Sequence, residues 1–180
     1  MTTAQDQVVE RITGYIRHNA AKEPQAVRDL VQTGHAQISA LLDATSETQA
    51  TFKPAPDVWS VLELMAHVVT AKGGVARICE RLARGEQIGG TGREGDEQDG
   101  IARGTLASLA DARQAMDAAH AELLAFIDAR LSQADLTPRF KHFLFGDLNC
   151  REWAVFQRVH DGDHAGQIEQ IKAAPGYPVS

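Results

Sequence analysis

The sequence predicts an all-α fold, a four-helix bundle with an extra N-terminal helix. Apolar residues recur at helical spacing in five segments. Alanine is abundant, whereas runs of Val, Ile, Thr and Tyr are scarce, which favours helices over strands. No segment predicts a strand. We expect one domain over residues 1–180, with the N-terminal helix in 1–20 and the bundle in 24–173.

A proline separates the first two predicted helices. Val8, Ile12 and Ile16 have helical spacing, which predicts a helix over about 4–19. Pro24 interrupts this pattern, because the residue before a proline avoids helical dihedral angles, and proline suits the first turn of a new helix. A second helix is therefore predicted over about 24–44. The segment that follows it contains two prolines and is predicted to be a loop.

The third helix has a well-defined start and is followed by an unusual connection. Ser60 and Glu63 are spaced as a capping box, which predicts a helix over about 61–83. In the next segment, 85–104, seven of twenty residues are glycine. We interpret it as a long solvated connection between bundle helices two and three. A phosphate-binding loop is the alternative, but the segment lacks a preceding strand and the lysine and hydroxyl residues that end a Walker motif.

Two more helices complete the predicted bundle. Apolar residues at helical spacing predict one over about 105–131. The last is predicted over about 150–173, because Asn149 and Glu152 repeat the capping-box pattern at its start. The segment between these two helices, 132–149, is predicted to be irregular.

Charge and composition exclude several classes of function. The formal net charge is −6 and no basic patch is present, which disfavours a partner with a phosphate backbone, so no nucleic acid is expected. No apolar run approaches the ~18 residues that suggest a membrane span, and the N-terminus lacks the features of a signal peptide. The two cysteines do not form a disulfide framework. We therefore expect a cytoplasmic protein that does not bind membranes.

Three histidines are predicted to meet inside the bundle. His160 and His164 are four residues apart, so both side chains leave the same side of the last helix. His67 lies on the predicted inner side of the helix over 61–83, which also includes Ala71 and Ile78. Imidazole nitrogen binds several divalent ions, and three protein ligands leave room for water or substrate. The pattern predicts a divalent-metal site, for zinc, nickel, iron or manganese; hydrogen-bonded core histidines are the alternative.

Other residues near the predicted site have weaker assignments. Gln167 lies one helical turn beyond the histidine pair and is placed to touch the site. His35 could face the same cavity, although a hydrogen-bonded core histidine is the preferred interpretation. Asp161 and Asp163 are both expected in solvent, because neighbours in sequence leave a helix in different directions. Cys150, at a helix N-terminus, could have an acidified thiol, but a small buried residue is preferred. No general acid or base can be assigned.

Three ordered motifs resemble those of the DinB/YfiT-like metalloenzymes. The motifs are WSVLELMAHV at 59–68, GDLNCREW at 146–153 and HDGDHAGQI at 160–168. The resemblance implies a four-helix bundle with a long connection between helices two and three, a divalent metal held by three histidines and, in many members, a homodimer. The family's ligand positions fall on His67, His160 and His164.

The same resemblance implies an activity. Family members with known activity look like thiol S-transferases and mycothiol-dependent isomerases, in which the metal binds a low-molecular-weight thiol. A divalent ion favours ionisation of a bound thiol, and the thiolate is the nucleophile. A metal-dependent, transferase-like enzyme acting on a small electrophile is the first expectation. The alternative is a stress-associated protein that binds a metal or a small ligand without turnover, and the sequence does not decide between them.

Overall fold

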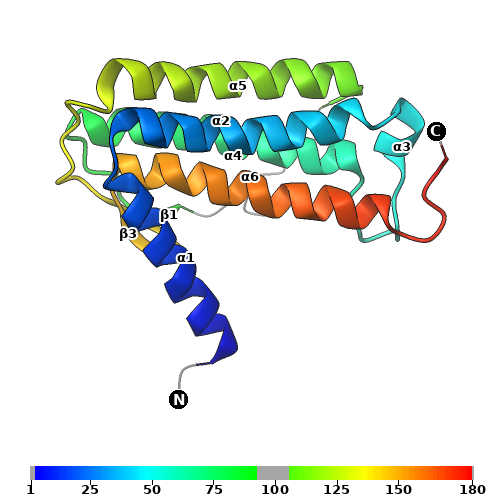
Figure 1. Cartoon of the computed structure of the whole chain (residues 1–180), viewed down its shortest axis with the longest axis horizontal. Coiled ribbons are helices and arrows are strands. Elements are labelled where there is room, and N and C mark those ends of the chain that lie inside the picture. Colours follow the sequence, from blue (N-terminus) through cyan, green and yellow to red (C-terminus); the bar gives the residue numbers. More distant parts are fainter. Residues whose placement is uncertain (1–2, 93–105, 180) are drawn as a thin grey trace.

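Four long helices lie side by side and form the body of the molecule (Figure 1). The structure, a computed structural model, describes residues 3–92 and 106–179. Within these residues it contains six helices and three short strands. The helices are α1 (Ala4–Ala20), α2 (Pro24–Asp43), α3 (Glu47–Thr51), α4 (Val61–Ala83), α5 (Leu109–Arg130) and α6 (Cys150–Lys172). The strands are β1 (Thr91–Gly92), β2 (Phe140–His142) and β3 (Gly146–Leu148). The predicted all-α bundle with an extra N-terminal helix is confirmed.

The direction of each helix explains the long connection in the middle of the chain. The colours of Figure 1 show that α2 and α6 run in one direction and that α4 and α5 run in the other. Because α4 and α5 are parallel neighbours, the end of α4 and the start of α5 lie at opposite ends of the bundle. The predicted connection over 85–104 lies in this interval, and its residues from 93 onward are outside the described residues. Helix α1 packs on α6 and projects from the bundle (Figure 1).

Both helices that carry the predicted site begin at the predicted capping boxes. At the start of α4, the Ser60 side chain accepts a hydrogen bond from the Glu63 backbone, and the Ser60 N–H donates to the Glu63 carboxylate. At the start of α6, Asn149 and Glu152 form the equivalent pair of bonds. These caps satisfy backbone N–H groups that have no partner within the helix. They fix the residue at which each helix begins, and therefore the depth of each histidine in the bundle.

The prediction of an irregular segment over 132–149 was wrong. Strand β2 pairs with β3 in antiparallel register, with Phe140 opposite Leu148, and β1 runs parallel to β2. The turn between β2 and β3 ends at Gly146, whose φ of +74° suits glycine. Strands of two or three residues are too short to show an alternating pattern, so the sequence gives no periodic signal for them.

Two element boundaries near loops also differ from the prediction. The predicted loop after α2 contains the short helix α3, which is capped by Ser46. Helix α5 begins at Leu109 rather than near 105, because Ser108 is extended and its side chain accepts a hydrogen bond from the backbone of Asp111, as an N-cap does.

The bundle core consists of two apolar clusters, with polar side chains between them. One cluster includes Val31, Val75 and Leu123, near the α1 end of the bundle. The other includes Ile38, Val68 and Met116. Six polar residues lie between these positions on the four helices, and we call them the polar layer: His35, Lys72, His120, Gln157, His160 and Asp161. Five of them are buried, so each needs a partner inside the protein.

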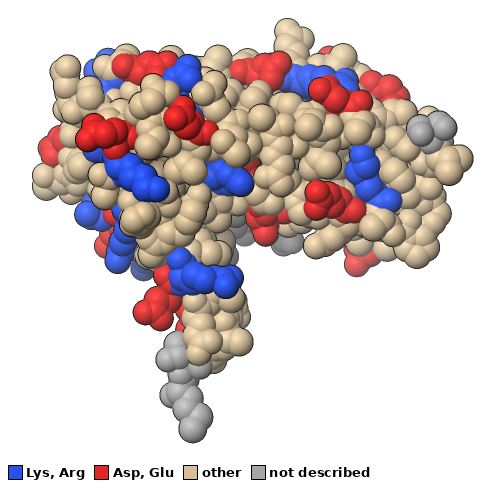
Figure 2. All heavy atoms as spheres, in the orientation of Figure 1, with Lys and Arg blue, Asp and Glu red and all other residues tan. Residues whose placement is uncertain are grey.

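Charged side chains on the surface are mixed in sign. On the face shown in Figure 2, Lys and Arg alternate with Asp and Glu over the helices. Among the described residues, no helix is both long enough and apolar enough to cross a membrane.

Candidate metal centre

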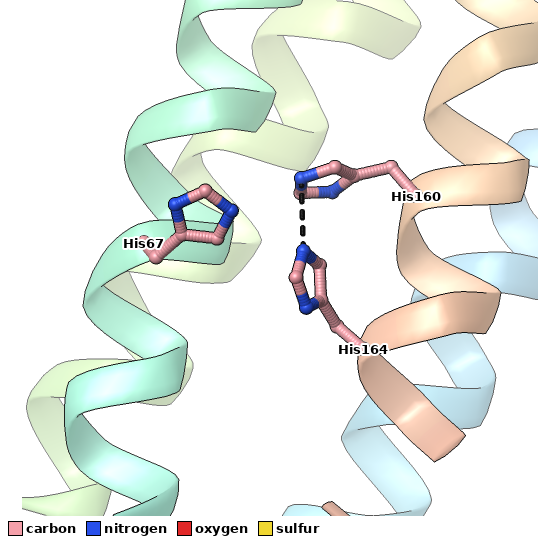
Figure 3. Close-up of side chains that lie close together, drawn as sticks. All are labelled: His67, His160 and His164. Carbon is pink, nitrogen blue, oxygen red and sulfur yellow. Dashed lines mark hydrogen bonds between the residues drawn. The ribbon is translucent and has the colours of Figure 1, made fainter. Parts of the chain in front are cut away.

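Three histidines from two antiparallel helices meet in the bundle. His67 comes from α4, and His160 and His164 come from α6 (Figure 3). All three are buried, and each offers one ring nitrogen that lies within 4.8 Å of the other two. In the described part of the chain, no other group of three or more His, Cys, Asp or Glu side chains converges in this way. The structure therefore brings together the three residues that the sequence predicted as ligands.

The geometry of these nitrogens fits a single divalent ion. The Nε2 atoms of His160 and His164 are 3.1 Å apart (Figure 3). Nitrogens bound at ~2.1 Å and at a tetrahedral angle are separated by roughly 3.4 Å, which is close to this spacing. Two neutral rings at this distance repel through their lone pairs unless a proton or a cation lies between them. The donor set is three imidazoles without a carboxylate or thiolate, which suits zinc, nickel and iron(II).

Burial keeps one of these rings uncharged. Removal from water lowers the pKa of His160 well below the ordinary value of an imidazole, and the neighbouring histidines and Lys72 lower it further. His160 is therefore neutral at pH 7, and a neutral imidazole is the form that binds metal. Trp59 lies against His67, with ring centroids 5.4 Å apart, and Phe156 lies against His160, with centroids 5.8 Å apart. The cluster is thus held by helix packing and by two aromatic neighbours.

Gln167 contacts the site. Its side-chain oxygen lies 3.1 Å from Nδ1 of His164, and its amide nitrogen donates to Asp163 at 3.3 Å. A carboxylate only accepts hydrogen bonds, so the amide nitrogen must face Asp163 and the oxygen must face the ring. Nδ1 of His164 then carries the proton, and Nε2 keeps a lone pair directed at the other histidines. Contacts of this kind commonly orient histidine ligands.

The expectation that Asp161 lies in solvent was wrong. Asp161 is fully buried, and one of its carboxylate oxygens accepts a hydrogen bond from the ammonium group of Lys72 at 2.9 Å. Gln157 donates to the other oxygen at 2.7 Å. Gly34 on α2 makes room for this carboxylate, because a Cβ at that position would lie 3.0 Å from it. Asp163, in contrast, is exposed as expected.

Lys72 was not singled out from the sequence, although a signal was available. One row of buried residues in α4 follows alternating steps of four and three from Val61, and Lys72 occupies a position in this row between Val68 and Val75. The predicted inner side passed through Ala71 and Ile78, which are only half-buried. A lysine at such a position is fully enclosed and requires a buried carboxylate partner. The same spacing on α6 would have identified Asp161.

His35 does not face the three-histidine site. Its ring stacks on the ring of His120 from α5, with centroids 3.8 Å apart and an angle of 1° between the planes. Nε2 of His35 donates to the Asp117 carboxylate at 3.2 Å. The interpretation of His35 as a hydrogen-bonded core histidine therefore fits the structure, whereas a role as a pocket residue of the metal centre does not.

Cys150 is a buried thiol rather than a reactive one. Burial raises the pKa of the Cys150 thiol to about 11, which outweighs the hydrogen bonds that lower it. Cys79 is also free and buried. Neither thiol is ionised near pH 7, so neither has the thiolate form that reacts or binds metal.

Comparisons with known proteins agree with the fold. A sequence model of the DinB superfamily matches residues 30–168, a range that contains all three histidines. The crystal structure of TT2238, a four-helix bundle protein, is similar with a TM-score of 0.59 and 19% identity, over 82% of this chain and 99% of that chain. At that identity the likeness concerns the fold alone. No curated protein matches the chain in sequence.

Proposed function

The chain belongs to the DinB superfamily, and on this premise we propose that it binds one divalent metal ion through His67, His160 and His164. The observation that carries the proposal is the convergence of three buried ring nitrogens within 4.8 Å of one another. Two features support it. His160 is uncharged at pH 7, and a hydrogen bond to Gln167 directs the lone pair of His164 into the cluster.

We further propose that the ion serves a thiol-dependent transfer or isomerisation on a small electrophile. A bound divalent ion favours the ionised form of a thiol. In a transfer, the thiol sulfur forms a bond to the electrophilic carbon, the leaving group departs with the bonding electron pair, and the thiol proton passes to solvent. In this reaction the three histidines would hold the ion, and Gln167 would fix the orientation of the His164 ring. The family resemblance supports this class of reaction, and the ligand set is compatible with it.

A metal-binding protein without turnover is the second candidate, and one observation favours it. The carboxylate of Asp161, the residue that follows His160 in the sequence, accepts hydrogen bonds from Lys72 and Gln157. Asp163 is engaged by Gln167. Neither carboxylate is free to act as a general base in this arrangement.

Metal analysis tests the first part of the proposal. Protein purified without chelator is expected to hold about one ion per chain, as a three-histidine site would. The variant His160→Ala should hold almost none. His18→Ala is the matched control, because His18 is exposed on α1. Equal metal content in wild type and His160→Ala, or none in wild type after exposure to zinc, nickel, iron and manganese, contradicts the proposed site.

A panel of biological thiols with electrophilic acceptors tests the second part. Turnover that requires both the ion and the thiol, and that disappears in His160→Ala, supports the enzyme. A protein that binds metal but shows no turnover across the panel supports the second candidate.

We also propose a homodimer, as the family resemblance implies. Helix α1 projects from the bundle (Figure 1), and Val8 and Tyr15 on it are exposed, so a second copy could cover them. Sedimentation velocity measures the mass in solution, and a species of one chain at micromolar concentration argues against this part of the proposal.

A further inference from the structure

The sequence around the last two histidines is symmetric about Gly162. Residues 157–167 are QRVHDGDHAGQ, and each half contains one glutamine, one aspartate and one histidine. In both halves the glutamine amide donates to the aspartate carboxylate, at 2.7 Å in one and 3.3 Å in the other. We call them the inner half (Gln157, His160, Asp161) and the outer half (Asp163, His164, Gln167).

The outer half places the proton of its histidine away from the cluster. As described above, the Gln167 oxygen accepts from Nδ1 of His164, so this ring carries its proton on Nδ1. Its Nε2 is left with a lone pair.

The inner half does the opposite. In this half the amide nitrogen of Gln157, not its oxygen, faces Nδ1 of His160, at 3.5 Å. An amide nitrogen can only donate, so Nδ1 of His160 is the acceptor and the proton of this ring is on Nε2. A second contact agrees: the Nε2 atoms of His160 and His164 are 3.1 Å apart, and since Nε2 of His164 carries a lone pair, Nε2 of His160 is the donor. Two independent contacts therefore assign the same tautomer.

Asp161 and Lys72 hold the Gln157 amide in this orientation. The ammonium group of Lys72 occupies one oxygen of Asp161, and the remaining oxygen accepts from Gln157. All three side chains are fully buried, so no water competes with these bonds. The Gln157 oxygen is also buried and accepts no hydrogen bond from the described residues. The hydrogen bond from the Gln157 amide to the charged Asp161 carboxylate thus stabilises this orientation by more than the unpaired Gln157 carbonyl oxygen costs.

We propose that Gln157 is a positioning residue that keeps the proton of neutral His160 on Nε2, the nitrogen that faces the other histidines, and that Lys72 acts with it through Asp161. A ligand nitrogen must present a lone pair, so metal binding requires this proton to move to Nδ1. The inner half therefore weakens metal binding, whereas the outer half prepares His164 for it. The statement about affinity rests on the proposed function; the statement about the proton of His160 does not.

The test exchanges the acid and the amide of the inner half, as the double variant Gln157→Glu with Asp161→Asn. The exchange keeps the charge and nearly the volume of the pair. The new carboxylate at 157 accepts from the amide at 161 and from Nδ1–H of His160. In metal-free protein, ¹⁵N–¹H spectra of the histidine rings are expected to show the proton of His160 on Nε2 in wild type and on Nδ1 in the variant. Zinc affinity should increase about tenfold or more in the variant.

The outer half provides the matched control, Asp163→Asn with Gln167→Glu. His164 already carries its proton on Nδ1, so this exchange should leave its tautomer unchanged and should alter zinc affinity less than the inner exchange does.

The outcomes separate this inference from the proposed function. Wild type with the proton of His160 on Nδ1 overturns the inference, and this measurement does not require the variant to fold. The inference is also overturned if the double variant of the inner half keeps the proton of His160 on Nε2, or if it binds zinc more weakly than wild type. Wild type that binds no zinc but shows the expected tautomers contradicts the proposed function and leaves the assignment of the proton standing.

Discussion

Two groups of histidines lie in the interior of the bundle, and their rings are arranged differently. In the three-histidine cluster the ring edges face one another, so nitrogens from different residues converge within 4.8 Å. In the other group the ring of His35 lies flat on the ring of His120, with 1° between their planes. The lone pair of an imidazole lies in the plane of its ring. The lone pairs of the two stacked rings therefore lie in two parallel planes with ring centroids 3.8 Å apart, so this second group cannot share one ion.

The difference shows that ring orientation, and not the presence of histidines, determines what a buried group can bind. The rings of the stacked pair have lowered pKa values, so they bind protons less readily than an imidazole in water does. Burial, together with the nearby His35, Lys72 and Arg28, lowers the pKa of His120 to about 3. The pKa of His35 is also lowered, mainly by burial and by Lys72, although Asp117 and Asp161 raise it. Burial thus disfavours the charged form of His160 in the cluster and of both rings in the stacked pair, but only the cluster presents a set of nitrogens to a cation.

Metal-dependent stability separates the two groups most strongly. Zinc at about a thousand times its dissociation constant should stabilise the wild type by about 4 kcal/mol, which is roughly 10 °C in Tm for a chain of this size. The variant His164→Ala should lose this shift. The variant His120→Ala should keep it, even if its metal-free Tm is lower. Thermal denaturation with and without zinc measures the shift; a zinc-dependent shift lost in His120→Ala and kept in His164→Ala would reverse the assignment.

A smaller effect is expected from the residue that orients a ligand. Replacing Gln167 by Leu removes the acceptor of Nδ1–H of His164, and changes of this kind cost about 10- to 100-fold in metal affinity. Gln170→Leu is the control, because Gln170 is exposed on the same helix. Competition with a chromogenic chelator measures the two affinities. Equal affinities in these variants would remove Gln167 from the site.

The smallest effect concerns the stacked pair and pH. The pKa values of His35 and His120 are lower in the folded protein than the ordinary value of about 6.5, so the unfolded chain binds protons that the folded protein does not. Their contribution to stability is complete above about pH 6.5 and is lost as pH falls, by at most about 1.4 kcal/mol per pH unit for each ring.

The variant His120→Phe should reduce this loss. Urea unfolding of metal-free protein at pH 7 and pH 5 measures it, because the slope with pH should be shallower in the variant than in wild type. His160, whose pKa is also lowered, contributes to the slope in both proteins and therefore does not affect the difference. The same slope in both proteins would show that the stacked pair is not a source of the pH dependence.

Much of the fold was predictable from short-range signals. The starts of α4 and α6 are set by capping boxes that occupy four residues each, and the pair His160 and His164 needs only the period of a helix. His67 followed from its position on a helix with a defined start. These features depend on interactions between residues that are at most four positions apart, so they can be read from the sequence alone.

The features that were missed depend on contacts across the bundle. The ion pair of Lys72 with Asp161 joins residues 89 positions apart, and neither residue shows its partner locally. Strands β1, β2 and β3 have only two or three residues each, so they form only when they pair with one another in the sheet. The tautomer of His160 depends on the orientation of the Gln157 amide, which is set by that ion pair. The spacing along each helix could have shown that Lys72 and Asp161 are buried, but their pairing, the pairing of the strands and the tautomer become visible only when the four helices are in place.

We propose that the cluster, and not the stacked pair, holds the metal. Anomalous diffraction at the absorption edge of the bound ion, with crystals grown from protein loaded with zinc, distinguishes the two groups. A single strong anomalous peak is expected about 2.0–2.1 Å from one ring nitrogen of each of His67, His160 and His164. No peak at this position, or a peak at His35 and His120, would contradict it.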